Sequence, residues 1–150
     1  MNESGIWARS GNTVLSNLVL FYGMDPQLLE FKTQIAIRTS SDLRKPDKHT
    51  RKLLFYLFTS TRGGFSRLRI IALLLQQPLN THQLSKQLDL DYKAIQHHLQ
   101  VLEKNNMISK IGRRYGVTYR LSNFLEMNLG VLIEAIEKLD TKVNHKKTYI

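Results

Sequence analysis

Residues 81–108 read THQLSKQLDLDYKAIQHHLQVLEKNNMI, and this stretch decides the fold. Its first eight residues predict a short helix, preceded by a capping box that Asn80 and Gln83 can form. A three-residue segment follows, in which Leu90 is expected to face inward and Asp91 to cap the next helix through its side-chain oxygen. The pattern predicts two helices joined by a short turn, which is a helix-turn-helix.

The second of these helices, expected over residues 92–105, divides into two faces at about 100° per residue. The buried stripe consists of Ile95, His98, Leu99 and Leu102. The opposite side, here called the polar face, consists of Lys93, Gln96, His97, Gln100 and Lys104. This face is cationic and rich in amides, and it lacks the carboxylates that an exposed helix normally mixes in. It predicts a recognition helix, and the plainer interpretation is a solubilising surface.

After residue 106 the hydrophobic period changes from 3.6 to 2, which predicts paired strands over 107–111 and 117–121. The connection between them, Gly112-Arg113-Arg114-Tyr115-Gly116, places two arginines at the tip of a hairpin. Guanidinium groups there could reach phosphates or a narrow minor groove. The connection therefore predicts a DNA-contacting wing, although exposed arginines on a loop often serve only as solvated charge.

Two further helices are expected before the helix-turn-helix. An apolar run over residues 53–58 predicts the first, which Gly63-Gly64 should end because glycine readily adopts a positive φ. The second is expected to begin at Ser66 and to stop before Pro78, which lacks a backbone donor.

The N-terminal part of the chain is less informative. Residues 40–52, with Pro46 and many basic side chains, predict a hydrophilic linker. Upstream of it, residues 14–22 suggest one short helix, whereas residues 31–38 fit neither a helix nor a strand clearly. The expected domains are an extension with a basic linker (1–50), the helix-turn-helix unit with its wing (51–122) and a C-terminal helix (123–150).

The composition is that of a folded globular domain with a strong positive charge. The 150 residues carry 22 Lys and Arg against 12 Asp and Glu, a net charge of +10, and contain no cysteine. The excess is concentrated in residues 62–122, where 10 basic and 3 acidic side chains give +7. A polyanionic partner is the leading expectation, and thiol chemistry is excluded. With no export signal and no apolar run of about 20 residues, we expect a cytoplasmic protein without a membrane span.

The last helix is expected to start at Ser122 or Asn123, with Glu126 completing a capping box, and to run to about Asp140. Apolar residues recur along it with a period of 3.5, as in a coiled coil. They are Leu125, Leu129, Leu132, Ile136, Leu139 and Val143. We interpret them as the seam of a two-fold dimer, and the alternative is that the helix docks on its own domain.

Residues 51–122 resemble the ArsR-like winged-helix regulators, and the archaeal branch in particular. The resemblance lies in RKLLFYLF followed by TRGG, in LDLDYKAIQHHLQVLEKNNMI and in YGVTYRLS. It covers about half of the chain and implies a DNA-binding transcriptional regulator, usually a dimer. Such proteins often carry glycine where this chain has Asp89. His98 matches the semi-buried histidine of the family's His-Leu pair, which implies a packing role.

The sequence thus predicts a mainly helical α+β protein, a winged helix-turn-helix flanked by an N-terminal segment and a C-terminal dimerisation helix. Double-stranded DNA is the expected partner. The residues expected at the DNA are Tyr92, Lys93, Gln96, His97, Gln100, Lys104, Arg113 and Arg114, with Lys110, Arg67 and Arg69 as weaker phosphate candidates.

Other functions are less supported. A winged-helix module that binds protein at a membrane surface, and an RNA-binding protein, are the competing interpretations. We expect no cofactor, and neither a phosphate-binding loop nor a zinc or nucleophile motif is present, so an enzyme is disfavoured. His97 and His98 point about 100° apart on a helix and cannot chelate one metal ion comfortably.

Overall fold

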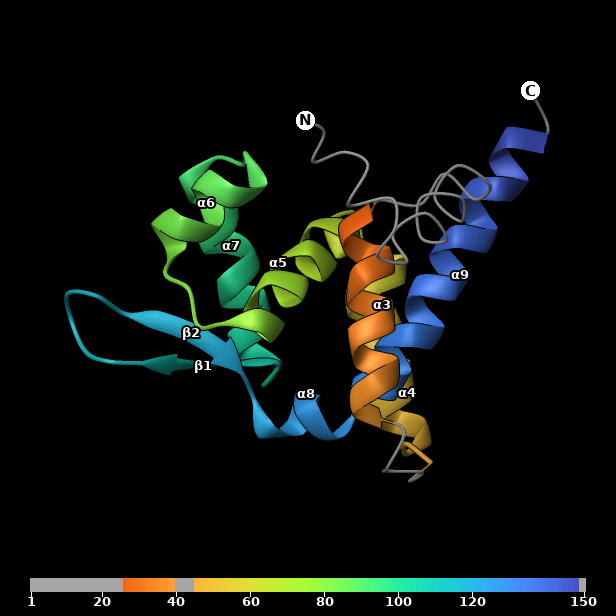
Figure 1. Cartoon of the computed structure of the whole chain (residues 1–150), viewed down its shortest axis with the longest axis horizontal. Helices are drawn as coiled ribbons and strands as arrows, with labels where there is room; N and C mark the ends of the chain where they lie inside the picture. The colour runs from red at the N-terminus through yellow and green to blue at the C-terminus, as the bar shows by residue number, and fades with distance from the viewer. Residues whose placement is uncertain (1–25, 40–44, 149–150) are drawn as a thin grey trace, which may run out of the picture.

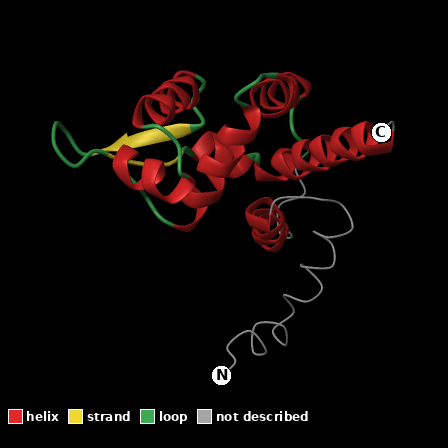
Figure 2. Cartoon of the chain, turned by 90° about the horizontal axis from the view of Figure 1, so that it is seen from above, coloured by secondary structure: helices red, strands yellow, loops and turns green. Residues whose placement is uncertain are grey.

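The computed structural model describes residues 26–39 and 45–148. It is an elongated molecule in which the β-hairpin projects at one end and the C-terminal helix at the other (Figures 1 and 2). The hairpin pairs β1 (Ile108–Ile111) with β2 (Thr118–Leu121), and the described residues otherwise form helices and connections. This arrangement confirms the predicted α+β class with a small hairpin wing.

The helix-turn-helix is formed by α6 (Thr81–Leu88) and α7 (Tyr92–Lys104). The predicted capping box is confirmed, because the Gln83 N–H donates to Asn80 Oδ1 at 2.8 Å and the Asn80 N–H to Gln83 Oε1 at 2.9 Å. Asp91 also caps α7 as predicted, since its carboxylate accepts from the backbone N–H of Lys93 at 2.9 Å. These caps satisfy backbone groups that the first turn of a helix leaves unpaired.

The turn between the two helices is closed by Asp89, which has a φ of 52° and a ψ of 49°. Its left-handed conformation ends α6, and glycine adopts this conformation at lower cost than any other residue. The following Leu90 is half-buried. Its N–H donates to the Ser85 carbonyl, and its own carbonyl accepts a hydrogen bond from the Ser85 hydroxyl. The turn is therefore fixed by local bonds as well as by packing.

The hairpin is antiparallel, with Ile108 opposite Leu121 and Ile111 opposite Thr118. Tyr119 on β2 exchanges two backbone hydrogen bonds with Leu79, just before α6. The middle of β2 is thereby tied to the segment before the helix-turn-helix, and the hairpin continues from there to the projecting loop 112–116 (Figure 1).

The segment before α5 (Gly64–Gln76) differs in three ways from the sequence prediction. Helix α4 spans Lys48–Phe55 because Asp47 caps it through the Thr50 N–H, so the linker expected over 40–52 ends earlier. The helix then continues as a π-helical turn, η2 (Tyr56–Ser60). Gly63 has a φ of −89° and does not end a helix by a positive φ.

At position 64 glycine is required for a steric reason, because a Cβ there would lie 2.3 Å from the carbonyl oxygen of Phe58. Glycine therefore allows α5 to begin directly against η2, two residues earlier than predicted.

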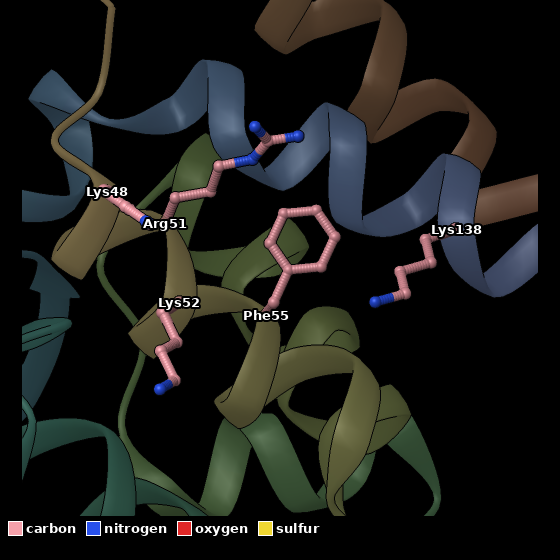
Figure 3. Close-up of a pocket in the computed structure, with 5 residues that line it drawn as sticks. All are labelled: Lys48, Arg51, Lys52, Phe55 and Lys138. Carbon is pink, nitrogen blue, oxygen red and sulfur yellow. The ribbon is translucent and has the colours of Figure 1, made fainter.

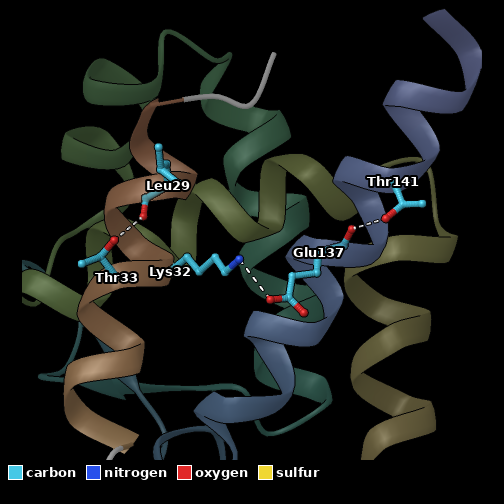
Figure 4. A network of polar contacts seen from close by, with 5 residues as sticks. All are labelled: Leu29, Lys32, Thr33, Glu137 and Thr141. Carbon is cyan, nitrogen blue, oxygen red and sulfur yellow. Dashed lines mark hydrogen bonds and ion pairs between the residues drawn. The ribbon is translucent and has the colours of Figure 1, made fainter. Parts of the chain in front are cut away.

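Residues 26–39 form one helix, α3 (Pro26–Thr39), and so settle the structure of the 31–38 segment. Phe31 and Ile35 on this helix are fully buried, and α3 packs against α5 and α9. Lys32 on α3 also pairs with Glu137 on α9 at 3.0 Å (Figure 4). Helix α3 is thus part of the core. The helix suggested over residues 14–22 lies outside the described residues.

The single helix expected over residues 122–140 is two helices, α8 (Asn123–Met127) and α9 (Leu129–Thr148). Ser122 is the cap of α8, accepting from the Leu125 N–H at 3.0 Å. Asn128 makes the break, because its side-chain amide bonds the Phe124 carbonyl at 2.8 Å and competes with the helix continuation.

Most of the residues predicted to form the dimer seam are buried within the single chain. Leu125, Leu129, Leu132 and Ile136 are at most 3% exposed, and Leu139 packs half-buried against the same core. The side chain of Val143 lies outside the described part. Because α9 packs on α3, α4 and η2, the expectation that Leu125, Leu129, Leu132 and Ile136 meet a second copy is corrected. Among the described residues, no helix is long and apolar enough to span a membrane.

Candidate nucleic-acid interface

The two faces of α7 are separated as the sequence predicted. Ile95, Leu99 and Leu102 are at most 1% exposed and hold the helix on the core. All five side chains of the polar face are exposed: Lys93, Gln96, His97, Gln100 and Lys104. Tyr92, at the first position of α7, is 46% exposed. The helix therefore presents amide and cationic groups to solvent from a rigid support.

The wing loop, residues 112–116, is exposed throughout. Three of its residues have a positive φ, namely Gly112, Arg114 and Gly116 at 93°, 56° and 77°. These angles turn the chain back toward β2 and leave Arg113 and Arg114 exposed at the tip. Tyr115 is 97% exposed, which makes it a further group that a groove or backbone could contact. Tyr115 was not among the residues that the sequence predicted to lie at the DNA.

A cleft lies between the wing and the start of the helix-turn-helix. It is lined by Asn80, Thr81 and His82 near α6, by Tyr92 and Gln96 on α7, and by Lys110, Arg113, Arg114, Tyr115 and other residues of the hairpin. The structure thus brings Tyr92 and Gln96 together with the wing arginines. Lys93, His97, Gln100 and Lys104 lie outside this cleft, on the open part of the polar face. Sequence reasoning missed His82, because only the fold brings it to the hairpin.

Not every candidate cation is available to a phosphate. The Lys110 ammonium pairs with Glu103 at 3.0 Å, and this hydrogen bond and charge raise the pKa of Lys110. Arg69 is half-buried and lies near the Leu88 carbonyl, at 3.5 Å. Arg67 is only 4% exposed. Its proposal as a phosphate contact is therefore wrong, because its guanidinium bonds the Leu57 carbonyl and the Thr61 hydroxyl inside the protein.

His98 faces this buried arginine. A Cβ on Gly63 would lie 2.7 Å from both Arg67 and His98, so the three residues are packed together. His98 Nδ1 is buried and has no hydrogen-bond partner in the described part of the protein. Burial, and then the charges of Arg67 and His97, lower the pKa of His98. Among the described residues, no three His, Asp or Glu side chains are grouped so that they could hold a metal ion.

An exposed polar helix behind a short turn, followed by a basic two-stranded wing, defines the winged helix-turn-helix class of DNA-binding proteins. Within this class, residues 66–110 match the family model described as "Bacterial regulatory protein, arsR family". The match runs from α5 through α6 and α7 to β1, less than a third of the chain. Fold and family match support a DNA-binding transcriptional regulator.

Two solved structures are similar to this chain. One is reduced HlyU from Vibrio cholerae N16961, with 23% identity over 61% of this chain and 90% of that one, at a TM-score of 0.46. The other is the adhesin competence repressor AdcR from Streptococcus pyogenes, with 16% identity over 93% of this chain and 81% of that one, at a TM-score of 0.36. No curated protein matches the sequence.

Proposed function

We propose that this protein binds specific sequences in double-stranded DNA, with α7 in the major groove and the wing loop on the backbone or in the adjacent minor groove. The observation that carries the proposal is the polar face of α7, which is fully exposed, contains no carboxylate and is backed by buried Ile95, Leu99 and Leu102. An α-helix fits the major groove, where each base pair presents a distinct set of donors and acceptors.

The side chains of the polar face suit different parts of the duplex. Gln96 and Gln100 can each bond adenine through two hydrogen bonds, and Lys93 can donate to guanine. His97 is placed to meet a base edge beside them. Tyr92, where α7 begins, would contact a phosphate or a thymine methyl, and Lys104, in the last turn, would contact the backbone.

Arg113 and Arg114 supply the non-specific part of the binding. Each phosphate neutralised by a cation releases counterions, which makes affinity fall with salt by a slope of about 0.9 per contact. The cleft between the wing and α7 is open to solvent, and Arg113 and Arg114 line it. The phosphate backbone of one DNA strand could therefore lie along it.

A salt titration of a fluorescent duplex tests the wing. Replacing Arg113 and Arg114 by Ala should weaken all duplexes similarly and reduce the salt slope by up to about 2. The matched control replaces Lys48 and Lys52, two exposed cations on α4, by Ala and should leave the slope unchanged. Wild-type affinity and slope in the arginine variant would remove the wing from the interface.

Specificity is tested by selecting duplexes from a random pool with the wild-type protein and with Gln96→Ala. We expect the variant to lose preference at one base position, at a cost of about 1–3 kcal/mol against the wrong base. Equal enrichment of all sequences by the wild type would mean that α7 does not read bases.

We further propose that the regulator works as a homodimer in the cytoplasm. Two copies of α7 related by a two-fold axis would reach successive major grooves about 34 Å apart, which predicts an inverted-repeat site. Since Leu125, Leu129, Leu132 and Ile136 are buried, a dimer would have to use other residues. Analytical ultracentrifugation with and without the selected duplex tests this, and one monomer on a single half-site would refute it. Membership of the archaeal branch, and the division at residues 50 and 122, stay predictions.

A further inference from the structure

A second group of cations lies away from α7 and the wing. Lys48, Arg51 and Lys52 on α4 and Lys138 on α9 line a shallow cleft of about 350 Å³ together with Phe55, here called the α4–α9 cleft (Figure 3). Helices α4 and α9 lie on the opposite side of α5 from the hairpin (Figure 1). The cleft is therefore separate from the proposed DNA interface.

Phe55 organises the cleft. Its ring lies between the side chains of Arg51 and Lys138, which come from the two helices (Figure 3). The Arg51 Cζ is 5.5 Å and the Lys138 Nζ 4.9 Å from the ring centroid, within the range of cation–π attraction. The half-buried ring thus provides an apolar surface flanked by positive charge, while Lys52 projects away from it.

The positive charge of the cleft is poorly balanced. Arg51 pairs with Glu134 at 2.6 Å, but in the described part of the chain Lys48, Lys52 and Lys138 form no ion pair. Like charges held around one ring repel each other, and the repulsion is relieved when an anion binds between them. Arg51 also keeps guanidinium donors beyond those that face Glu134.

We propose that the α4–α9 cleft binds a small aromatic anion, a carboxylate or phosphate carried on an aromatic ring. The anionic oxygens would lie between Lys48, Arg51 and Lys138, and the ring of the ligand would pack against Phe55 in an offset or edge-on arrangement. The volume of the cleft is at the lower end of the range for small-molecule sites. The inference rests on this cleft alone and is independent of DNA binding.

Calorimetric titration of the full-length protein at low salt tests the site with four probes. We expect phenyl phosphate and benzoate to bind one per chain, inorganic phosphate to bind at least several-fold more weakly, and benzyl alcohol not to bind. The two aromatic anions distinguish a phosphate ligand from a carboxylate ligand. Absence of binding by both would overturn the proposal, as would equal binding of inorganic phosphate and phenyl phosphate.

Two variants locate the site. Lys138→Ala should weaken binding of the better aromatic anion about tenfold, the effect of losing one charge-assisted contact. Phe55→Leu keeps an apolar side chain and should reduce the preference for phenyl phosphate over inorganic phosphate. Lys86→Ala, which alters an exposed lysine on α6, is the matched control and should bind as the wild type does.

The same Lys138→Ala variant also tests the alternative that the cleft binds nucleic acid. Lys138 is exposed, so the loss of its cation–π contact with Phe55 should shift the thermal unfolding curve only slightly, and lost binding would not reflect unfolding. If Lys138→Ala weakened duplex DNA as strongly as phenyl phosphate, or left phenyl phosphate binding unchanged, the proposed small-molecule site would be wrong.

Discussion

The guanidinium of Arg67 donates to the carbonyl oxygen of Leu57 through both Nε, at 3.0 Å, and Nη2, at 2.8 Å. The Thr61 hydroxyl donates to the same oxygen at 3.1 Å. This carbonyl lies in the π-helical turn η2, where the regular helical bonding pattern is interrupted. A buried cation on α5 thus compensates for an irregularity that joins α4 to α5.

Arg67→Lys tests that role. Lysine keeps the charge but cannot make the forked pair of bonds, so the free energy of unfolding should fall by about 1–3 kcal/mol. Urea denaturation followed by circular dichroism measures the change. Arg62→Lys, at an exposed position nearby, should have little effect. Equal loss in both variants would show that the Leu57 carbonyl does not depend on Arg67.

His98 should make the stability of the fold depend on pH. Burial and the nearby Arg67 charge lower its pKa in the folded state below the ordinary value of 6.5. The unfolded chain therefore takes up a proton first as the pH falls, and stability decreases below about pH 6.5 until the lower, folded-state pKa is passed. Above pH 6.5 both states are neutral at this residue, and the contribution is constant.

Chemical denaturation at pH 7.5, 6.5 and 5.5 measures this dependence. His98→Gln should flatten the fall between pH 6.5 and 5.5, whereas His82→Gln, which alters an exposed histidine on α6, should retain it. If His98→Gln kept the wild-type pH dependence, another group would have to cause the fall.

Two glycines should respond in opposite directions to the same substitution. Gly64→Ala places a Cβ against the Phe58 carbonyl and should destabilise the protein by about 1–3 kcal/mol or more, since backbone must move. Gly130→Ala, within α9, meets nothing within 4 Å and should stabilise by up to about 1 kcal/mol. Thermal unfolding of both variants gives the comparison. A neutral Gly64→Ala would mean that α5 does not begin tightly against η2.

The parts of the fold that sequence could predict are those fixed by local bonds. The caps at Asn80 and Asp91 and the exposed polar face of α7 depend on residues within one or two helical turns. The cleft beside the wing required the long-range pairing of Leu79 with Tyr119, which no local pattern indicates.

Two failures, the dimer seam and the phosphate role of Arg67, have a different cause, because each concerns which surface a helix packs against. A period of 3.5 shows that α9 has an apolar stripe, but α3, α4 and η2 cover that stripe within the same chain. In the same way, an arginine can bind phosphate, but Arg67 lies on the buried side of α5 and points into the protein.

The turn between α6 and α7 allows a final test at two aspartates: Asp89 ends α6 in a left-handed conformation, and Asp91 caps the start of α7. Asp89 has a φ of 52°, which costs an ordinary side chain about 1–2 kcal/mol and glycine very little. Asp89→Gly should therefore match or exceed the wild type in thermal stability by up to about 1 kcal/mol, whereas Asp89→Val should lose about 1–2 kcal/mol. Asp91→Ala removes the cap of α7 and should lose about 1 kcal/mol. If Asp89→Val were as stable as the wild type, the left-handed conformation assigned to residue 89 between α6 and α7 would be wrong.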